Sequence, residues 1–120
     1  MKKSNYRTGH FAEKIALFYL ILKGYWPVKI NYVTGRGTGA SEIDLIVRKG
    51  HTLIFVEVKK RKNLTTSAEA ITSKAQQRIA RAAEAFLRKN VVFKNYQIRF
   101  DAILFGKNIW PHHIKDAWRL

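Results

Sequence analysis

Apolar side chains recur along the chain with a helical period in two places. Residues 7–23 are good helix formers and end before Gly24, a residue that favours a helix C-terminus. The second half of this segment is apolar on nearly all sides, so we expect the fold to cover it. A second helix is predicted over residues 66–89, since Thr66 and Glu69 have capping-box spacing. Its apolar stripe consists of Ile71, Ala75, Ile79, Ala82, Ala83 and Phe86.

Between the two helices, the pattern changes to that of β-strands. Residues 27–33 are a short candidate strand, and residues 42–48 alternate between apolar and polar positions. Residues 53–61 are rich in β-forming side chains, and Lys49-Gly50 is a hairpin turn signal. The alternation in the second of these strands places three residues on one face: Ile43, Leu45 and Val47.

A further strand is predicted after the second helix, over residues 97–105. The tail from Trp110 is too short and mixed to assign. If residues 53–61 and 97–105 share a sheet, the helix between them makes a right-handed crossover that joins parallel strands. The sequence therefore predicts an α/β fold with a mixed central β-sheet flanked by helices. Residues 1–120 are expected to form one domain.

Composition narrows the class of protein. Hydrophobic residues make up 47% of the chain and charged residues 26%, as in globular proteins. There is no cysteine, which excludes disulfides and thiolate metal sites. The longest apolar run, 15–22, is too short to span a bilayer, and no signal peptide is recognisable. We therefore expect a cytoplasmic protein.

The charge balance indicates the partner. Lys and Arg number 23 against 8 Asp and Glu, a formal net charge of +15. Such an excess attracts polyanions, and nucleic acid is the partner it favours. A membrane is not expected to be the partner, because the basic residues are spread along the chain rather than gathered on one amphipathic helix.

With so few acids, their positions are informative. Glu42, Asp44 and Glu57 all lie within the two central predicted strands, where carboxylates are depleted. If Lys49-Gly50 is the whole turn, Asp44 is opposite Phe55 and lies diagonally from Glu57, with Cβ atoms roughly 7–8 Å apart. Lys59 then joins the same face. A three-residue loop would put the two acids on opposite faces.

Acids this close repel each other, and at about 4 Å and an effective dielectric near 20 one pair costs on the order of 4 kcal/mol. Lys59 offsets part of this repulsion, and a divalent cation would offset the rest. Carboxylates without cysteine or adjacent histidine favour a hard ion, Mg²⁺ or Mn²⁺. A Glu-x-Lys pair alone is more often a solvated strand surface. Ile46, Leu53 and Phe55 on the same face argue that this one is covered.

Several strings of the sequence resemble those of one family. Residues 41–46 (SEIDLI), 55–59 (FVEVK) and Arg61 are similar to the YraN-type, UPF0102 family of small endonuclease-like proteins. The opening helix and the second helix also resemble the family's, and the likeness runs from about Gly9 to about Asp101. Asp-(x)n-Glu-x-Lys is weakly specific by itself, whereas the combined set of strings is specific.

The resemblance implies a restriction-endonuclease-like core of the PD-(D/E)xK type, similar to archaeal Holliday-junction resolvases. It implies that Asp44, Glu57 and Glu13 bind the metal and that Lys59 orients or activates the attacking water. Glu42 matches a characteristic family position without an assigned role. Likeness to resolvases also implies a homodimer, because two symmetric cuts need two sites.

Other polar residues are candidates for contacts with nucleic acid. The basic run that leads from the site, the second helix and the glycine-rich loop supply the candidates: Lys60, Arg61, Lys62, Lys74, Arg78 and Arg36. A solvated face is an equal alternative for Lys74 and Arg78. Gln77 is a candidate for lining the site. Trp110 and Trp118 have the chemistry to stack on bases, although aromatic residues near a terminus more often pack on the core.

The sequence therefore predicts a metal-dependent endonuclease that hydrolyses phosphodiester bonds in DNA, including branched or structured DNA. The alternative is a nucleic-acid-binding module on the same fold that does not cleave and acts with partner proteins. Asp44, Glu57, Lys59 and Glu13 are the residues expected to carry the chemistry.

Overall fold

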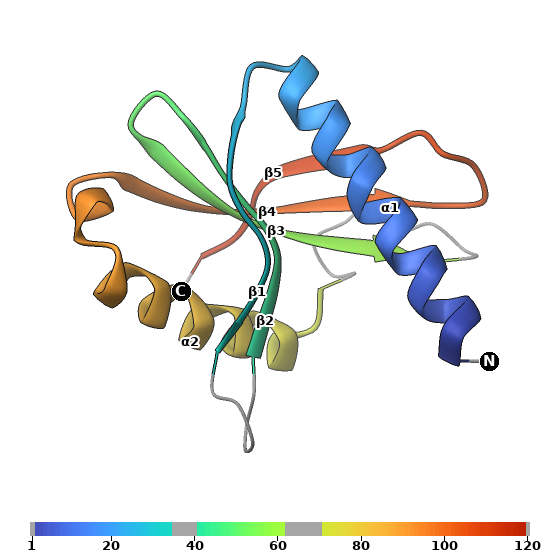
Figure 1. Cartoon of the computed structure of the whole chain (residues 1–120), viewed down its shortest axis with the longest axis horizontal. Coiled ribbons are helices and arrows are strands. Elements are labelled where there is room, and N and C mark those ends of the chain that lie inside the picture. Colours follow the sequence, from blue (N-terminus) through green and yellow to red (C-terminus); the bar gives the residue numbers. More distant parts are fainter. Residues whose placement is uncertain (1, 35–40, 62–70, 120) are drawn as a thin grey trace.

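The centre of the protein is a five-stranded sheet whose strands lie in chain order, β1-β2-β3-β4-β5 (Figure 1). This computed structural model describes residues 2–34, 41–61 and 71–119. β3 and β4 are parallel, and the other neighbouring pairs are antiparallel. The α/β class and the mixed sheet are confirmed. The strands are β1 (Trp26–Thr34), β2 (Ser41–Lys49), β3 (Thr52–Lys60), β4 (Gln97–Phe105) and β5 (His112–Trp118).

Two helices cover opposite faces of the sheet. α1 (Lys2–Leu22) packs on β3 and β1, and α2 (Ser73–Lys89) packs on β2 and β1. Alternation in β3 separates the two cores, because Ile54 packs in the cluster below α1 and Phe55 in the cluster below α2. A short 3₁₀ turn, η2 (Val91–Phe93), follows α2. Among the described helices, none is both long and apolar enough to cross a membrane.

The β2–β3 hairpin has a different turn from the predicted one. Lys49 pairs with Thr52, so the turn is Gly50-His51 and not Lys49-Gly50. Gly50 has φ +61°, which the first position of a type II′ turn requires. The register moves by two residues, and Ile46 rather than Asp44 lies opposite Phe55. A shift of two residues does not change which face each side chain points to, so Asp44 and Glu57 still share one face, as predicted.

β2 separates from β3 near its start, and this alters a second prediction. Pairing between the two strands runs from the turn to Leu45↔Val56, while pairing between β1 and β2 continues to the other end of β2. β1 and β2 curve together towards α2, and β3 continues beneath α1 (Figure 1). Ile43 therefore packs below α2, although alternation predicted the same face as Leu45. Two-stranded ribbons twist more strongly than wider sheets, which explains the change.

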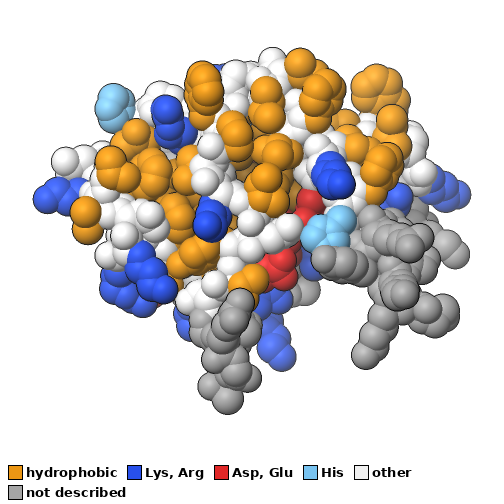
Figure 2. Space-filling model, in the orientation of Figure 1, with side chains coloured by type: hydrophobic (Ala, Val, Ile, Leu, Met, Phe, Trp, Pro, Cys, Tyr) orange, Lys and Arg blue, Asp and Glu red, His pale blue; other side chains and the backbone are white. Residues whose placement is uncertain are grey.

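The expectation that the fold covers the second half of α1 is wrong. Ala12, Ala16 and Leu20 face the sheet and are buried, but Phe18 and Leu22 are exposed. A helix on one face of a sheet buries a single stripe, and no described segment covers the outer side of α1. Hydrophobic side chains accordingly gather on the upper surface of the molecule (Figure 2).

The start of α2 also differs from the prediction. The N-cap is Thr72, whose side chain accepts a hydrogen bond from the Ala75 N–H at 3.1 Å. Thr66 and Glu69, the predicted capping box, lie outside the described residues. The predicted apolar stripe from Ile71 to Phe86 is buried in the core below α2. The helical period therefore predicted the buried face correctly, whereas the capping-box spacing did not predict the N-cap.

The tail of the chain contains a strand that the sequence did not predict. β5 pairs with β4, and it brings the side chain of His113 onto buried Asp101 at 2.8 Å. Asp101 also accepts two hydrogen bonds from the guanidinium of Arg99 and one from the Asp116 N–H. Burial disfavours ionisation of Asp101, but these hydrogen bonds outweigh it and keep its pKa below the ordinary value. The carboxylate thus fixes β5 to the sheet.

Removing this carboxylate should destabilise the fold strongly. Asp101→Ala leaves Arg99 and the Asp116 N–H without their partner, and loss of one member of a buried ion pair costs about 3–5 kcal/mol. Urea unfolding measures the change. Arg119→Ala is the control, because it removes an exposed ion pair with Asp116 and should cost under about 1 kcal/mol. Equal losses in the two variants would contradict the role of Asp101.

Candidate metal centre

A cavity of about 360 Å³ lies where β2 separates from β3, between residues of both helices. Four of the eight acidic residues of the chain line it, although the whole protein carries a net charge of +15. Such a concentration is not expected of a solvated strand surface, where the acids would be dispersed. The cavity is lined by Ala12, Glu13, Glu42, Asp44, Glu57, Val58, Lys59, Lys60 and Arg78.

Asp44 occupies the point where the strands separate. Its Oδ2 accepts a hydrogen bond from the Val58 N–H at 2.8 Å. A side chain thereby binds a backbone donor of β3 beyond the last pair of the ladder, Leu45↔Val56. The interaction fixes the position of the Asp44 carboxylate, because Oδ2 is hydrogen-bonded to the backbone of the neighbouring strand.

Two further carboxylates approach Asp44, one from α1 and one from β2. Single oxygens of Glu13, Glu42 and Asp44 all lie within 4.8 Å of one another. Oε1 of Glu13 is buried and accepts no hydrogen bond from the described residues. The nearby ring nitrogen Nδ1 of His10 is 3.6 Å from this oxygen. An oxygen in this state is available to a cation.

Glu57 lies deeper, with only 4% of its surface exposed. Its Oε2 is 3.5 Å from Nζ of Lys59 and 3.4 Å from a guanidinium nitrogen of Arg78. Glu57 also lies within hydrogen-bonding reach of Asp44. The predicted neighbours Asp44, Glu57 and Lys59 therefore meet in one place, and Arg78 joins them from α2.

Crowding of the acids changes how easily they ionise. Burial, followed by the charge of Asp44, raises the pKa of Glu57 to about 8, although Lys59 and Arg78 act in the opposite direction. Burial and the charge of Asp44 likewise raise the pKa of Glu13 to about 8. The pKa of Glu42 is raised for the same reasons. At neutral pH the cluster therefore holds protons that a cation would displace.

The donors fit a hard divalent cation. Carboxylate oxygens are the ligands that Mg²⁺ and Mn²⁺ prefer, and both ions bind where several acids converge. Glu13 and Asp44 belong both to the ligand set that the family resemblance implies and to the group of converging oxygens. Glu42, which the sequence left without a role, joins that group, while Oε2 of Glu57 is directed at cationic side chains.

The remaining predicted residues lie at different distances from the cavity. Lys60 lines it, and Arg61 is exposed immediately beyond. Lys74 is exposed on α2, one turn before Arg78. Gln77 is exposed and does not line the cavity, so the structure does not support a role for it there. Arg36 and Lys62 lie outside the described residues.

Sequence reasoning missed three features of the site. One is the bond from the Val58 N–H to Asp44, which depends on where the ladder ends and has no sequence signal. A second is the closeness of Glu42 to Glu13, for which the Glu-x-Asp spacing in β2 is a weak signal. Arg78 was predicted as a nucleic-acid contact, and its ion pair with Glu57 was not foreseen.

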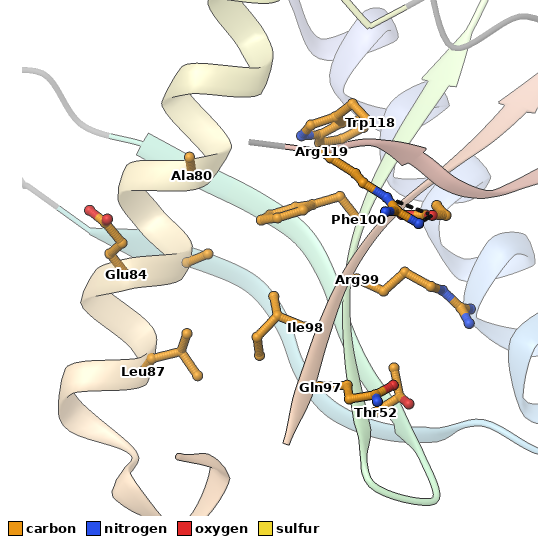
Figure 3. Close-up of a pocket in the computed structure, with 12 residues that line it drawn as sticks. Thr52, Ala80, Glu84, Leu87, Gln97, Ile98, Arg99, Phe100, Trp118 and Arg119 are labelled. Atoms are coloured by element: carbon orange, nitrogen blue, oxygen red, sulfur yellow. Dashed lines mark hydrogen bonds and ion pairs between the residues drawn. The ribbon is translucent and has the colours of Figure 1, made fainter. Parts of the chain in front are cut away.

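A larger cavity of about 530 Å³ lies elsewhere, between α2 and the starts of β3 and β4 (Figure 3). Its walls are mainly apolar and include Leu87, Ile98 and Phe100. Two of its charged groups, Asp116 and Arg119, pair with each other at 2.7 Å. No group of converging acids lines it among the described residues. This cavity is the larger of the two, but the converging acids line the smaller one.

A five-stranded mixed sheet between two helices, with four acids and three cations lining a cavity where two strands separate, defines an α/β protein with a candidate metal centre. The chain belongs to UPF0102, described as an uncharacterised protein family, whose sequence pattern matches residues 12–105. A UPF0102 protein of Paramagnetospirillum magneticum is 43% identical over 95% of this chain and 88% of its own length. One of Parvibaculum lavamentivorans is 42% identical over 95% of this chain and 83% of its own.

The raised pKa values predict how stability depends on pH. The ordinary pKa of glutamate is 4.5, and those of Glu13 and Glu57 in the fold are about 8. Between these values the folded chain binds more protons than the unfolded chain, so the free energy of unfolding should fall as pH rises. Thermal unfolding of the metal-free protein from pH 5 to pH 8.5 measures this.

Glu57→Gln should reduce this dependence, because glutamine keeps the shape of the protonated side chain and does not titrate. Glu84→Gln, at an exposed position of α2 away from the acidic cavity, should leave it unchanged. A pH dependence of the Glu57→Gln variant equal to that of the wild type would contradict the assignment.

Proposed function

We propose that this protein is a metal-dependent nuclease that hydrolyses phosphodiester bonds in DNA. The observation that carries the proposal is the convergence of Glu13, Glu42 and Asp44 beside the Glu57–Lys59 pair in a strongly basic chain. The converging acids supply ligands for a metal ion, and the excess of basic residues attracts the polyanionic substrate. A site for an acidic small molecule would not need this concentration of carboxylates.

Glu13, Glu42 and Asp44 would hold a Mg²⁺ or Mn²⁺ ion, with Glu57 next to Asp44 as a further ligand candidate. When bound, such an ion polarises a phosphoryl oxygen and makes water a better nucleophile near neutral pH. The raised pKa values of Glu13 and Glu57 mean that these side chains release protons when they become ligands. Asp44 needs little reorientation, because the Val58 N–H already fixes it.

Lys59 and Arg78 supply positive charge to the wall of the cavity. Both are partly exposed, and both are held by the same oxygen of Glu57. An ammonium or guanidinium in such a position stabilises the negative charge that develops on the phosphate during hydrolysis. Lys59 would also orient the attacking water, the role that the family resemblance implies. Glu57 thereby positions two cations as well as neighbouring the proposed ion.

Exposed basic residues extend from the cavity along two elements. Lys60 and Arg61 continue the end of β3, and Lys74 lies on α2. These side chains would contact phosphates on either side of the cut, because lysine and arginine at a surface bind the backbone without reading sequence. The resolvase-like homodimer, the PD-(D/E)xK grouping and the cytoplasmic location remain predictions that rest on the sequence.

Cleavage of DNA by wild type and variants tests the function. Asp44→Asn keeps an oxygen for the Val58 N–H but removes the charge, and it should lower the rate at least roughly 10²-fold. Glu57→Ala should also lower the rate. Lys59→Ala should lower it by roughly 10²–10³-fold, as loss of one group that stabilises developing charge does. The assay uses single-stranded, duplex and branched DNA, and RNA, with Mg²⁺ or Mn²⁺.

Glu84→Gln is the matched control, because it removes an exposed acid of α2 outside the site. Activity that persists in Glu57→Ala would refute the assigned site. Tight binding of DNA without cleavage in either metal would instead favour the non-cleaving module.

Direct measurement of Mn²⁺ binding tests the ligand set. Glu42→Gln should weaken Mn²⁺ binding by roughly 10-fold or more, because its oxygen lies in the converging group. The resemblance alone assigned no ligand role to Glu42. Calorimetric titration at pH 8 measures the affinity, with Glu84→Gln as control. Wild-type affinity in Glu42→Gln would leave Glu13, Asp44 and Glu57 as the ligands.

A further inference from the structure

The two tryptophans near the end of the chain have opposite environments. Trp118 is 7% exposed and stacks on Phe100, with ring centroids 5.4 Å apart. Trp110 is 76% exposed, and its neighbour Ile109 is also exposed. Ile109 and Trp110 lie in the loop between β4 and β5, whereas Trp118 is the last residue of β5. Trp118 therefore contributes to the core, whereas Trp110 presents a large apolar side chain to solvent.

The backbone around Trp110 is constrained on both sides. The Trp110 N–H donates a hydrogen bond to Oδ1 of Asn108 at 3.1 Å. Pro111 follows directly, and a proline restricts the residue before it to extended conformations. Trp110 is thus held at a defined position of the loop, which lowers the entropy lost when its ring packs against a partner.

The loop lies beyond the end of β3 that carries the candidate metal centre. Lys60 pairs with Phe105, and the Arg61 N–H donates to the Phe105 carbonyl at 2.9 Å. The loop begins at the next residue and extends on the same side as the end of β3 (Figure 1). Glu57 precedes Lys60 by three residues, which is roughly 10 Å of strand. Trp110 therefore lies in a loop at the same end of the sheet as the candidate metal centre.

The charges around the β4–β5 loop indicate which kind of partner Trp110 would contact. Lys107, His112, Lys60 and Arg61 are exposed on this side, and residues 102–115 contain no acid. A second copy of a chain with net charge +15 would be repelled from such a surface. A nucleic acid would be attracted, and its bases offer flat apolar faces of the size of an indole ring.

We propose that Trp110 stacks on an unpaired base of the nucleic acid strand bound at the carboxylate site. This inference rests on the proposed function and names its substrate class: nucleic acids with unpaired bases a few nucleotides from the cut, such as overhangs, gaps and junctions. A continuous duplex offers no free base face, because insertion between stacked bases requires unstacking them. Lys60, Arg61 and Lys107 hold the phosphates while Trp110 selects for the unpaired base.

Binding in EDTA tests the proposal without cleavage. The probes are a duplex with a single-stranded overhang that carries 2-aminopurine, and a blunt duplex of the same length. Trp110→Ala should weaken binding of the overhang probe by roughly 5- to 150-fold, the range that loss of one base–aromatic stack produces. Binding of the blunt duplex should change less than 3-fold, roughly the spread of an uninvolved surface substitution. The wild type should quench the fluorescence of 2-aminopurine, and Trp110→Ala should not.

Two variants keep the experiment specific. Trp26→Ala removes another tryptophan, 63% exposed, which pairs with Arg48 near the Gly50-His51 turn, and it should leave binding unchanged. Trp110→Phe keeps an aromatic face and should restore most of the affinity for the overhang. Circular dichroism checks that each variant is folded.

Several results would overturn the proposal. These are unchanged binding in Trp110→Ala, an equal loss on both probes, or an equal loss in Trp26→Ala. A change in molecular mass, or lost binding to anionic vesicles without loss on the overhang probe, would assign Trp110 to a protein or membrane contact instead. The Glu57→Ala cleavage assay is independent of these measurements, so failure of the nuclease proposal would be recognised separately.

Discussion

One hydrogen bond, from the Val58 N–H to the Asp44 carboxylate, sets the geometry of the candidate site. Backbone donors inside a fold need acceptors, and β2 ceases to pair with β3 just before this donor. Asp44 supplies the acceptor, so the separation of the strands leaves a cavity instead of an unsatisfied edge. Glu13 on α1 and Arg78 on α2 reach the same point only because the strands separate there. The site is thus a product of the sheet's irregularity.

The separation also explains why a basic protein tolerates such a concentration of acids. Glu57 is buried beside Asp44, yet Lys59 and Arg78 both contact one of its oxygens. Residual repulsion is relieved by proton uptake, which the raised pKa values of Glu13 and Glu57 express. A divalent cation bound as proposed would compete with protons for these oxygens. In the proposed function, the acidic cavity would attract the metal ion, and the basic surface around it would attract the polyanionic substrate.

Much of this arrangement could be predicted from local patterns. The strand over residues 97–105, the parallel pairing and the buried stripe of α2 follow from periodicity, which reports burial directly. The sharing of a face by Asp44 and Glu57 survived a wrong turn because strand alternation has a period of two. Long-range packing decided the rest. Strand twist places Ile43 in the core below α2 instead of the one below α1. The outer side of α1 is exposed because no described segment packs on it. β5 is held by partners distant in sequence, such as Asp101.

The short Gly50-His51 turn restricts how the hairpin can vary among relatives. One residue inserted there would reverse the side-chain alternation of one strand relative to the other and turn Asp44 and Glu57 to opposite sides of the sheet. Insertions of two would keep the faces but slide the acids past each other. An insertion at the opposite end of β2 would not change the register between β2 and β3, because β2 no longer pairs with β3 there. Natural length variation should therefore accumulate in the connection between β1 and β2 and be rare at the tight turn.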